Sequence, residues 1–171
     1  MAGRAGAGTR RRKPLPPHLL PGTSRRRSNA GRLVGIVAGL AVAIFLIFAA
    51  STKDFADIEG DRAGGCRTLP IIYGVKKAAW MISPSFVLPW ILLPLGAYLR
   101  DPHAPEHTIL TGNPTLLVAL GAILMVWGAY TVYLLVRDPD SLTATENHPS
   151  WKHMYLMMMF AQVGFALAYI L

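Results

Sequence analysis

Four long apolar runs constrain this chain more than any other feature of its sequence. A helix rises 1.5 Å per residue, so about 18 apolar residues cross the ~27 Å core of a bilayer. Inside a bilayer the backbone must satisfy its own hydrogen bonds, which helices do. We therefore expect an all-α, multi-pass transmembrane helical bundle. Its four spans are Leu33–Ala50, Trp80–Leu99, Thr115–Val136 and Met154–Leu171.

The formal net charge of +8 is concentrated at the N-terminus. Residues 1–32 hold nine Lys or Arg and no acid, whereas residues 33–171 hold eight basic and nine acidic residues, a net charge of −1. This basic leader lacks a periodic apolar pattern and is predicted to be disordered. Its arginines could bind nucleic acid or anionic lipid, but only through nonspecific charge. No specific nucleic-acid partner is expected. A cleaved signal peptide is the alternative interpretation, but the first span is longer than the usual signal core of about 7–15 residues.

Three aspartates follow the first span, where isolated carboxylates should be avoided. If that helix continues through residue 61, a turn of about 100° per residue places Asp54, Asp57 and Asp61 within an arc of about 60°. Like charges this close repel each other unless a cation compensates. Carboxylates suit Mg²⁺, whose coordination is often completed by substrate phosphates. We therefore predict that these three aspartates bind Mg²⁺.

Three basic side chains accompany the aspartates. Lys53, Arg62 and Arg67 are candidate phosphate donors, Lys as a mobile point charge and Arg as a planar fork. Gly64 and Gly65 allow a sharp turn between the two arginines. A solvated, salt-bridged helix end is the alternative interpretation of this charged segment.

Two other site patterns do not fit this segment. An EF-hand beginning at Asp57 would need Gly at its sixth position and Glu at its twelfth, where the chain has Arg62 and Thr68. The phosphatidyl-alcohol transferases place Asp-Gly and then Ala-Arg ahead of two further aspartates, and the string EGDRAGG does not match that order.

Residues 53–74 closely resemble the second aspartate-rich motif of the UbiA superfamily of intramembrane prenyltransferases. The shared features are the Asp-x-x-Asp-x-x-x-Asp spacing, the EGDR string, Gly65, the RTLP string and the Tyr73-Gly74 pair. The combination of KD, DIEGDR and TLP is most similar to geranylgeranylglyceryl phosphate synthases. Homogentisate, chlorophyllide and quinone-precursor enzymes have related strings, so the subfamily stays open.

The resemblance implies a nine-helix bundle around a lipid-accessible cavity. Two aspartate-rich motifs would hold Mg²⁺ and the diphosphate of a polyprenyl donor, and the prenyl group would pass to a lipid or aromatic acceptor. By matching position, the resemblance assigns the metal site to Asp54, Asp57 and Asp61. It gives Lys53, Arg62 and Arg67 as candidate diphosphate contacts. No catalytic residue is assigned beyond this metal site.

The chain departs from the family pattern in its number of spans. Its four spans match the last four of about nine, so residues 33–171 are expected to form a partial UbiA-type domain. The other half, with the first aspartate-rich motif, would then be required for turnover. The alternative is a catalytically silent four-helix membrane protein that acts, if at all, through protein interaction.

The loops also predict an orientation in the cell membrane. Five Lys or Arg lie in residues 51–79, one in residues 100–114 and two in residues 137–153. The positive-inside rule therefore places the Asp-rich loop in the cytoplasm, although the basic leader favours the opposite orientation.

A second polar cluster lies on the same expected side of the membrane. His148, Trp151 and His153 could bind a metal or shape an acceptor pocket, but interfacial His and Trp more often anchor the membrane boundary. We therefore expect the anchoring role.

Overall fold

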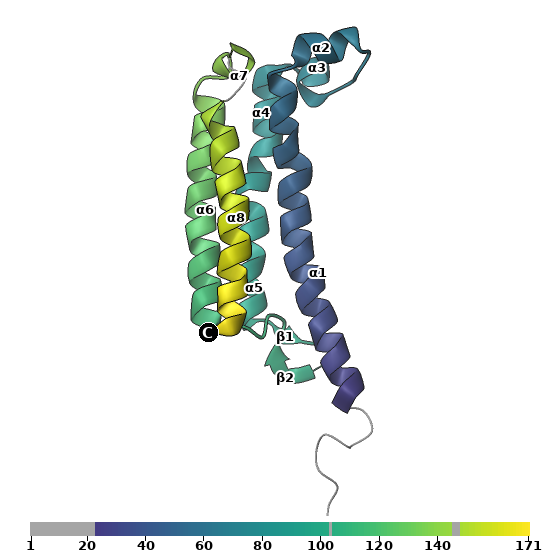
Figure 1. The fold of residues 1–171 in the computed structure, drawn as a ribbon, viewed down its shortest axis with the longest axis vertical. Coiled ribbons are helices and arrows are strands. Elements are labelled where there is room, and N and C mark those ends of the chain that lie inside the picture. The colour runs from purple at the N-terminus through teal and green to yellow at the C-terminus, as the bar shows by residue number, and fades with distance from the viewer. Residues whose placement is uncertain (1–22, 103, 145–147) are drawn as a thin grey trace, which may run out of the picture.

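The chain forms four long helical segments, and the connections between them contain short helices and a β hairpin (Figure 1). The computed structural model describes residues 23–102, 104–144 and 148–171, and the side chains from residue 33 onward except 104. Residues 1–22 of the predicted basic leader lie outside the described residues. With 3-10 helices labelled η, the elements are α1 (Thr23–Ala49), η2 (Ala50–Phe55), α2 (Ile58–Ala63), α3 (Leu69–Tyr73), α4 (Val75–Ile82), η3 (Ser83–Phe86), η4 (Leu88–Ile91), α5 (Leu92–Tyr98), β1 (Arg100–Asp101), β2 (Ala104–Thr108), α6 (Pro114–Arg137), α7 (Ser141–Ala144) and α8 (Pro149–Ile170).

Four helical segments are long and apolar enough to cross a membrane, and they confirm the predicted all-α, multi-pass bundle. They cover Leu33–Phe55, Val75–Tyr98, Pro114–Arg137 and Pro149–Ile170. The connection between the second and third spans contains a short antiparallel hairpin, β1–β2, which the sequence did not predict.

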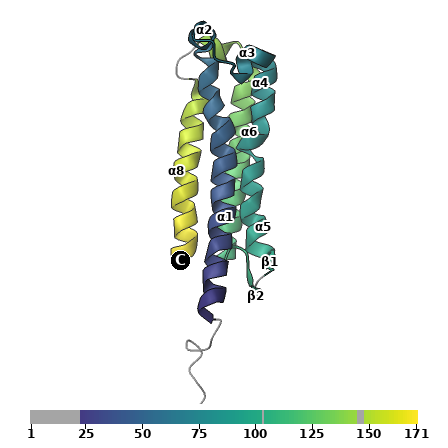
Figure 2. The ribbon, with the colours of Figure 1, turned by 90° about the vertical axis from the view of Figure 1, so that its right-hand side faces the viewer.

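The four spans pack side by side as a bundle, and residues of α1, the second span and α8 line one pocket between them. Helix α1 contacts the second span, the second span contacts α6, and α6 packs along α8 (Figures 1 and 2). The short helices α2, α3 and α7 lie at one end of the bundle, and the β hairpin and the C-terminus lie at the other. The Asp-rich segment therefore shares its end with the beginning of α8.

Prolines break the second span into α4, η3, η4 and α5. Both 3-10 turns carry a proline in their first two positions. Proline donates no backbone hydrogen bond, so carbonyls one turn earlier lose partners. Two serine hydroxyls near these turns also donate to backbone carbonyls: Ser83 Oγ lies 2.8 Å from the oxygen of Ala79, and Ser85 Oγ lies 2.6 Å from that of Ile82.

Two glycines of α6 allow its backbone to approach this irregular span. A Cβ at Gly121 would lie 3.0 Å from the carbonyl oxygen of Trp90, and a Cβ at Gly128 would overlap the carbonyl of Phe86. Small residues at such positions let membrane helices pack closely. The contact between α6 and the second span therefore depends on the absence of side chains at both positions.

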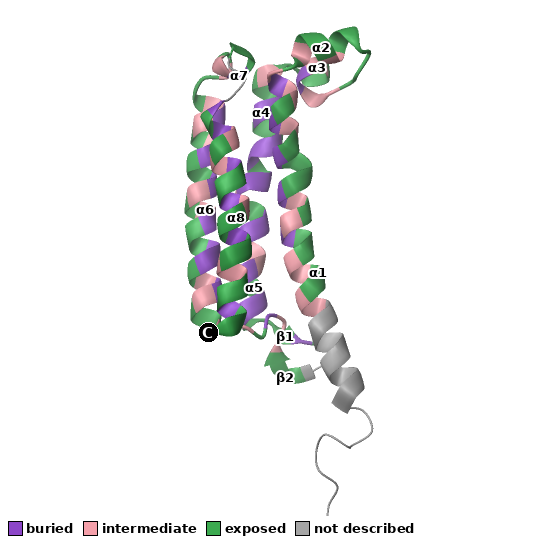
Figure 3. Cartoon of the chain, viewed as in Figure 1, coloured by how far each residue is buried: buried purple, intermediate pink, exposed green. Residues whose placement is uncertain are grey.

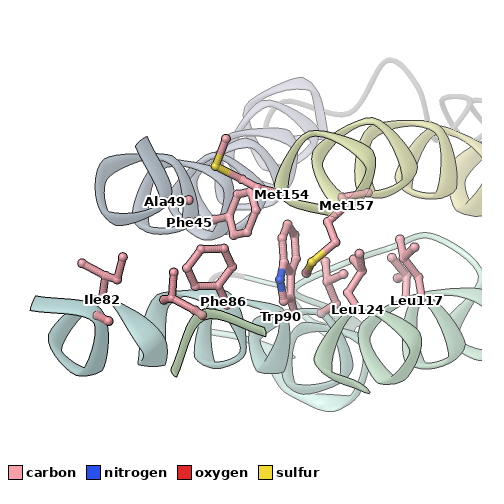
Figure 4. Close-up of a cluster of buried hydrophobic side chains, with 14 of the residues drawn as sticks. Phe45, Ala49, Ile82, Phe86, Trp90, Leu117, Leu124, Met154 and Met157 are labelled. Atoms are coloured by element: carbon pink, nitrogen blue, oxygen red, sulfur yellow. The ribbon is translucent and has the colours of Figure 1, made fainter. Parts of the chain in front are cut away.

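An aromatic cluster fills the space between α1 and the second span (Figure 4). The ring of Phe45 lies 5.8 Å from that of Phe86, edge to face, and 5.1 Å from that of Trp90. Such pairs add roughly 0.5–1.5 kcal/mol beyond the burial of their area. Buried faces turn toward the interior of the bundle, and exposed faces turn outward (Figure 3).

We expect Gly128→Ala to destabilise the bundle by roughly 1–3 kcal/mol, because the new methyl group would collide with the Phe86 backbone. The loss should appear even though Ala is intrinsically better in a helix by about 1 kcal/mol. Reversible unfolding in mixed micelles measures it. The matched control is Gly39→Ala on α1, where a Cβ would meet nothing within 4 Å. Equal stability of the two variants would contradict the close approach.

Candidate functional site

The first spanning helix tightens before it reaches the aspartates. Helix α1 ends at Ala49 and continues as the 3-10 helix η2, in which the Thr52 hydroxyl donates to the carbonyl oxygen of Ala49 at 2.7 Å. A hydroxyl bonded to the preceding turn competes with the regular helical ladder. The first helix therefore does not continue unbroken through Asp61, and the condition for placing the three aspartates on one helix face is not met.

A new helix, α2, begins directly after Asp57. Asp57 has φ −116° and ψ 30°, which interrupts the helix, and its carbonyl oxygen accepts from the backbone N–H of Asp61 at 2.9 Å. Its carboxylate lies so close to Gly60 that a Cβ there would collide with it. The Asp57 side chain therefore turns toward the first turn of α2.

Asp54 and Asp61 lie on either side of this turn, Asp54 in η2 and Asp61 in α2, and both side chains are partly buried. Within residues 23–102, 104–144 and 148–171, no group of three or more His, Cys, Asp or Glu side chains is arranged to hold a metal. Mg²⁺ is often held by only one or two carboxylates when substrate phosphates supply further ligands, so the predicted aspartates stay candidate ligands.

The two glycines after α2 form the sharp turn that the sequence predicted. Gly65 adopts a φ of 73°, the left-handed conformation that glycine tolerates. The N–H of Cys66 donates to the oxygen of Asp61 at 2.8 Å, and that of Gly65 donates to the oxygen of Arg62 at 3.2 Å. This paired pattern is the Schellman motif that ends many helices. It leaves Arg62 and Arg67 exposed on either side of the turn.

Lys53 contacts two aromatic rings of the last helix. Its Nζ lies 5.7 Å from the ring centroid of Trp151 and 6.0 Å from that of Tyr155. The neighbouring Thr52 hydroxyl lies 3.9 Å from the sulfur of Met154. The sequence favoured a membrane-anchoring role for Trp151 over a role in a metal site or acceptor pocket, and Tyr155 was not singled out. The available signal was their spacing of four residues, which places both rings on one face of a helix.

Thr68 is a further polar residue that sequence reasoning did not assign. It precedes α3, and its Oγ1 is buried without a hydrogen-bond partner among the described residues. An unsatisfied buried hydroxyl costs about 1–3 kcal/mol. The signal was present in the RTLP string, where this threonine stands.

The two histidines at this end serve the structure. The Nδ1 of His148 accepts from the backbone N–H of Ser150 at 3.3 Å and lies 2.8 Å from its hydroxyl, which caps α8. The Nδ1 of His153 accepts from the indole N–H of Trp127 at 3.0 Å. Each Nδ1 lone pair is thus engaged within the bundle.

Burial lowers the pKa of the His148 imidazole below its usual 6.5, although the Asp138 carboxylate acts in the opposite direction. The neutral ring is the form that caps α8, because a protonated Nδ1 cannot accept the Ser150 N–H. The lowered pKa and the cap therefore favour the same state.

Comparison with known proteins identifies relatives of this chain. It is 29% identical over 134 residues to the digeranylgeranylglyceryl phosphate synthase of Methanosphaera stadtmanae, covering 78% of this chain and 44% of the relative. It is 31% identical over 116 residues to that of Methanobrevibacter smithii, covering 68% of this chain and 36% of the relative. The resemblance to the UbiA prenyltransferases is confirmed.

A shorter stretch of 48 residues is 52% identical to the synthase of Pyrococcus furiosus, covering 27% of this chain and 17% of that protein. This UbiA-like chain spans less than half the length of the curated relatives that it matches. No family model and no solved structure matches it.

The stability of α8 should depend on pH through His148. The folded-state pKa is lowered, so the unfolded chain binds the proton more readily, and stability is complete above pH 6.5 and falls as the pH drops below it. Hydrogen exchange at residues 150–154 between pH 8 and pH 5 measures this. His148→Asn keeps a capping acceptor without a titrating ring and should remove the pH dependence. A variant that retains the full pH dependence would assign it to another group.

Proposed function

We propose that this chain carries the Asp-rich site of a membrane prenyltransferase that transfers a prenyl group from a polyprenyl diphosphate to a lipid acceptor. The proposal rests on the similarity to digeranylgeranylglyceryl phosphate synthases over 68–79% of this chain. Their name favours a glyceryl phosphate lipid over an aromatic acceptor. In the reaction, the acceptor oxygen bonds to the first prenyl carbon, the carbon–oxygen bond to the diphosphate breaks, and the acceptor hydroxyl loses its proton.

The charged residues of this end suit a diphosphate. Asp54, Asp61 and, after a side-chain rotation, Asp57 would hold Mg²⁺, which when bound offsets the charge of the phosphates. Lys53, Arg62 and Arg67 would donate to phosphate oxygens, since all three are exposed at the same end of the bundle. The apolar spans below them suit the prenyl chain. These residues bind and orient the donor so that its leaving oxygens face positive charge.

Turnover needs more than this segment. The resemblance implies a second aspartate-rich motif facing the first, and we infer that its residues are required to enclose the donor and exclude water. The described residues alone are therefore expected to bind Mg²⁺–diphosphate weakly. Binding, rather than turnover, is the direct test of the site in this chain.

We expect Asp54→Asn and Asp61→Asn each to weaken Mg²⁺-dependent binding of geranylgeranyl diphosphate by roughly tenfold or more, since even an outer-shell partner of a metal is worth about 10–100-fold. Titration calorimetry of the purified chain in detergent measures the affinity. The matched control is Asp140→Asn, which removes an exposed carboxylate at the same end of the bundle. Binding that is unaffected by both site variants, or absent without substitution, would overturn the proposed site.

We also propose that the Asp-rich end faces the cytoplasm in the cell membrane, as the loop charges favour. Cys66 is the single cysteine of the sequence and is exposed in this segment, so it can report the orientation without engineering. A membrane-impermeant maleimide should label it only after cells are permeabilised. His107→Cys in a Cys66→Ser background should show the reverse pattern, because it lies in the hairpin at the opposite end. Labelling of Cys66 in intact cells would invert the assignment.

A further inference from the structure

The beginning of α8 presents two aromatic rings to the Asp-rich segment. Trp151 and Tyr155 are four residues apart, so they share one face of the helix. The ammonium group of Lys53 lies over both, at 5.7 and 6.0 Å from the ring centroids. Both distances are within the ~6 Å at which a cation is attracted to the face of a ring.

These contacts restrict a side chain that is otherwise flexible. Lysine has a four-carbon stem with rotatable bonds, and holding it in one place costs rotamer entropy. Two rings on one side favour a single region of space for the ammonium group. Lys53 remains exposed, so an anion can still reach it from the solvent side. The rings therefore hold the cation without covering it.

The contacts of Lys53 with α8 also affect the position of the residues on either side of it in η2. It directly precedes Asp54, and the buried Thr52 before it touches Met154 of the same α8 segment. These contacts attach η2 to α8, although the two elements are far apart in the sequence. Fixing Lys53 against α8 therefore also fixes the end of the first span, from which the carboxylate of Asp54 projects.

We propose that Trp151 and Tyr155 are positioning residues that hold the ammonium group of Lys53, the residue before Asp54 in η2, in place to donate to a diphosphate oxygen. This inference rests on the proposed function for its ligand. This positioning role and membrane anchoring use different parts of the two side chains. An anchor depends on the polar N–H and O–H of Trp and Tyr at the interface, whereas holding a cation depends only on the ring faces.

The test separates the ring faces from the polar groups. One double variant, Trp151→Phe with Tyr155→Phe, keeps both rings, and a second, Trp151→Leu with Tyr155→Leu, removes them. The matched control is Tyr133→Leu, which removes a ring of α6 that lies 5.8 Å from the guanidinium of Arg137. All are purified as the full chain in detergent.

The first measurement needs no ligand. A brief pulse of an amine-acetylating reagent, followed by mass spectrometry, gives the reactivity of Lys53 relative to the exposed Lys76 in the same molecule. The Leu pair should raise it by roughly five- to thirty-fold, as expected for the loss of two cation–ring contacts. The Phe pair and Tyr133→Leu should stay near the unsubstituted chain. Equal reactivity in every variant would overturn the inference.

The second measurement is the affinity for inorganic diphosphate with Mg²⁺. The Leu pair should bind several-fold more weakly, and the Phe pair should recover most of the affinity. Unchanged affinity in the Leu pair, with Lys53 released, would overturn the positioning role while leaving the proposed function intact. No Mg²⁺-dependent binding by the unsubstituted chain would instead overturn the proposed function, and the labelling would still report whether the rings hold Lys53.

Discussion

The requirement that a membrane span satisfies its own backbone shapes this bundle. The second span contains prolines that interrupt its hydrogen-bond ladder, and its backbone forms two 3-10 turns at these points. The irregular backbone that results is then covered by α6, which comes closest where Gly121 and Gly128 lack side chains. Because α8 packs along α6, the position of the last helix also follows from this break.

The charged end of the molecule depends on a turn rather than on a helix face. Asp54 and Asp61 lie in two separate helical segments, because the chain tightens in η2, stops at Asp57 and starts again as α2. The Schellman turn at Gly65 then reverses the chain, so that basic side chains flank the acidic pair.

The spans and the family resemblance could be predicted because both depend on local signals, namely long apolar runs and a short motif. The end of the first helix could not be predicted, because it depends on the hydrogen bond that the Thr52 hydroxyl donates to a carbonyl of the preceding turn. The aromatic partners of Lys53 could not either, since they come from a helix far away in the sequence. Contacts of this kind need the packing of whole spans, which hydropathy does not specify.

The buried positions of the first span change their spacing along its length. Ala41, Phe45 and Ala49 are four residues apart, whereas Ala49, Thr52 and Phe55 are three apart. One stripe thus passes from an α-helical to a 3-10 period while it stays buried. Inserting or deleting a single residue between Phe45 and Phe55 would rotate everything beyond it by about a third of a turn. Among homologous chains, this stretch should therefore vary in residue type but keep a constant length.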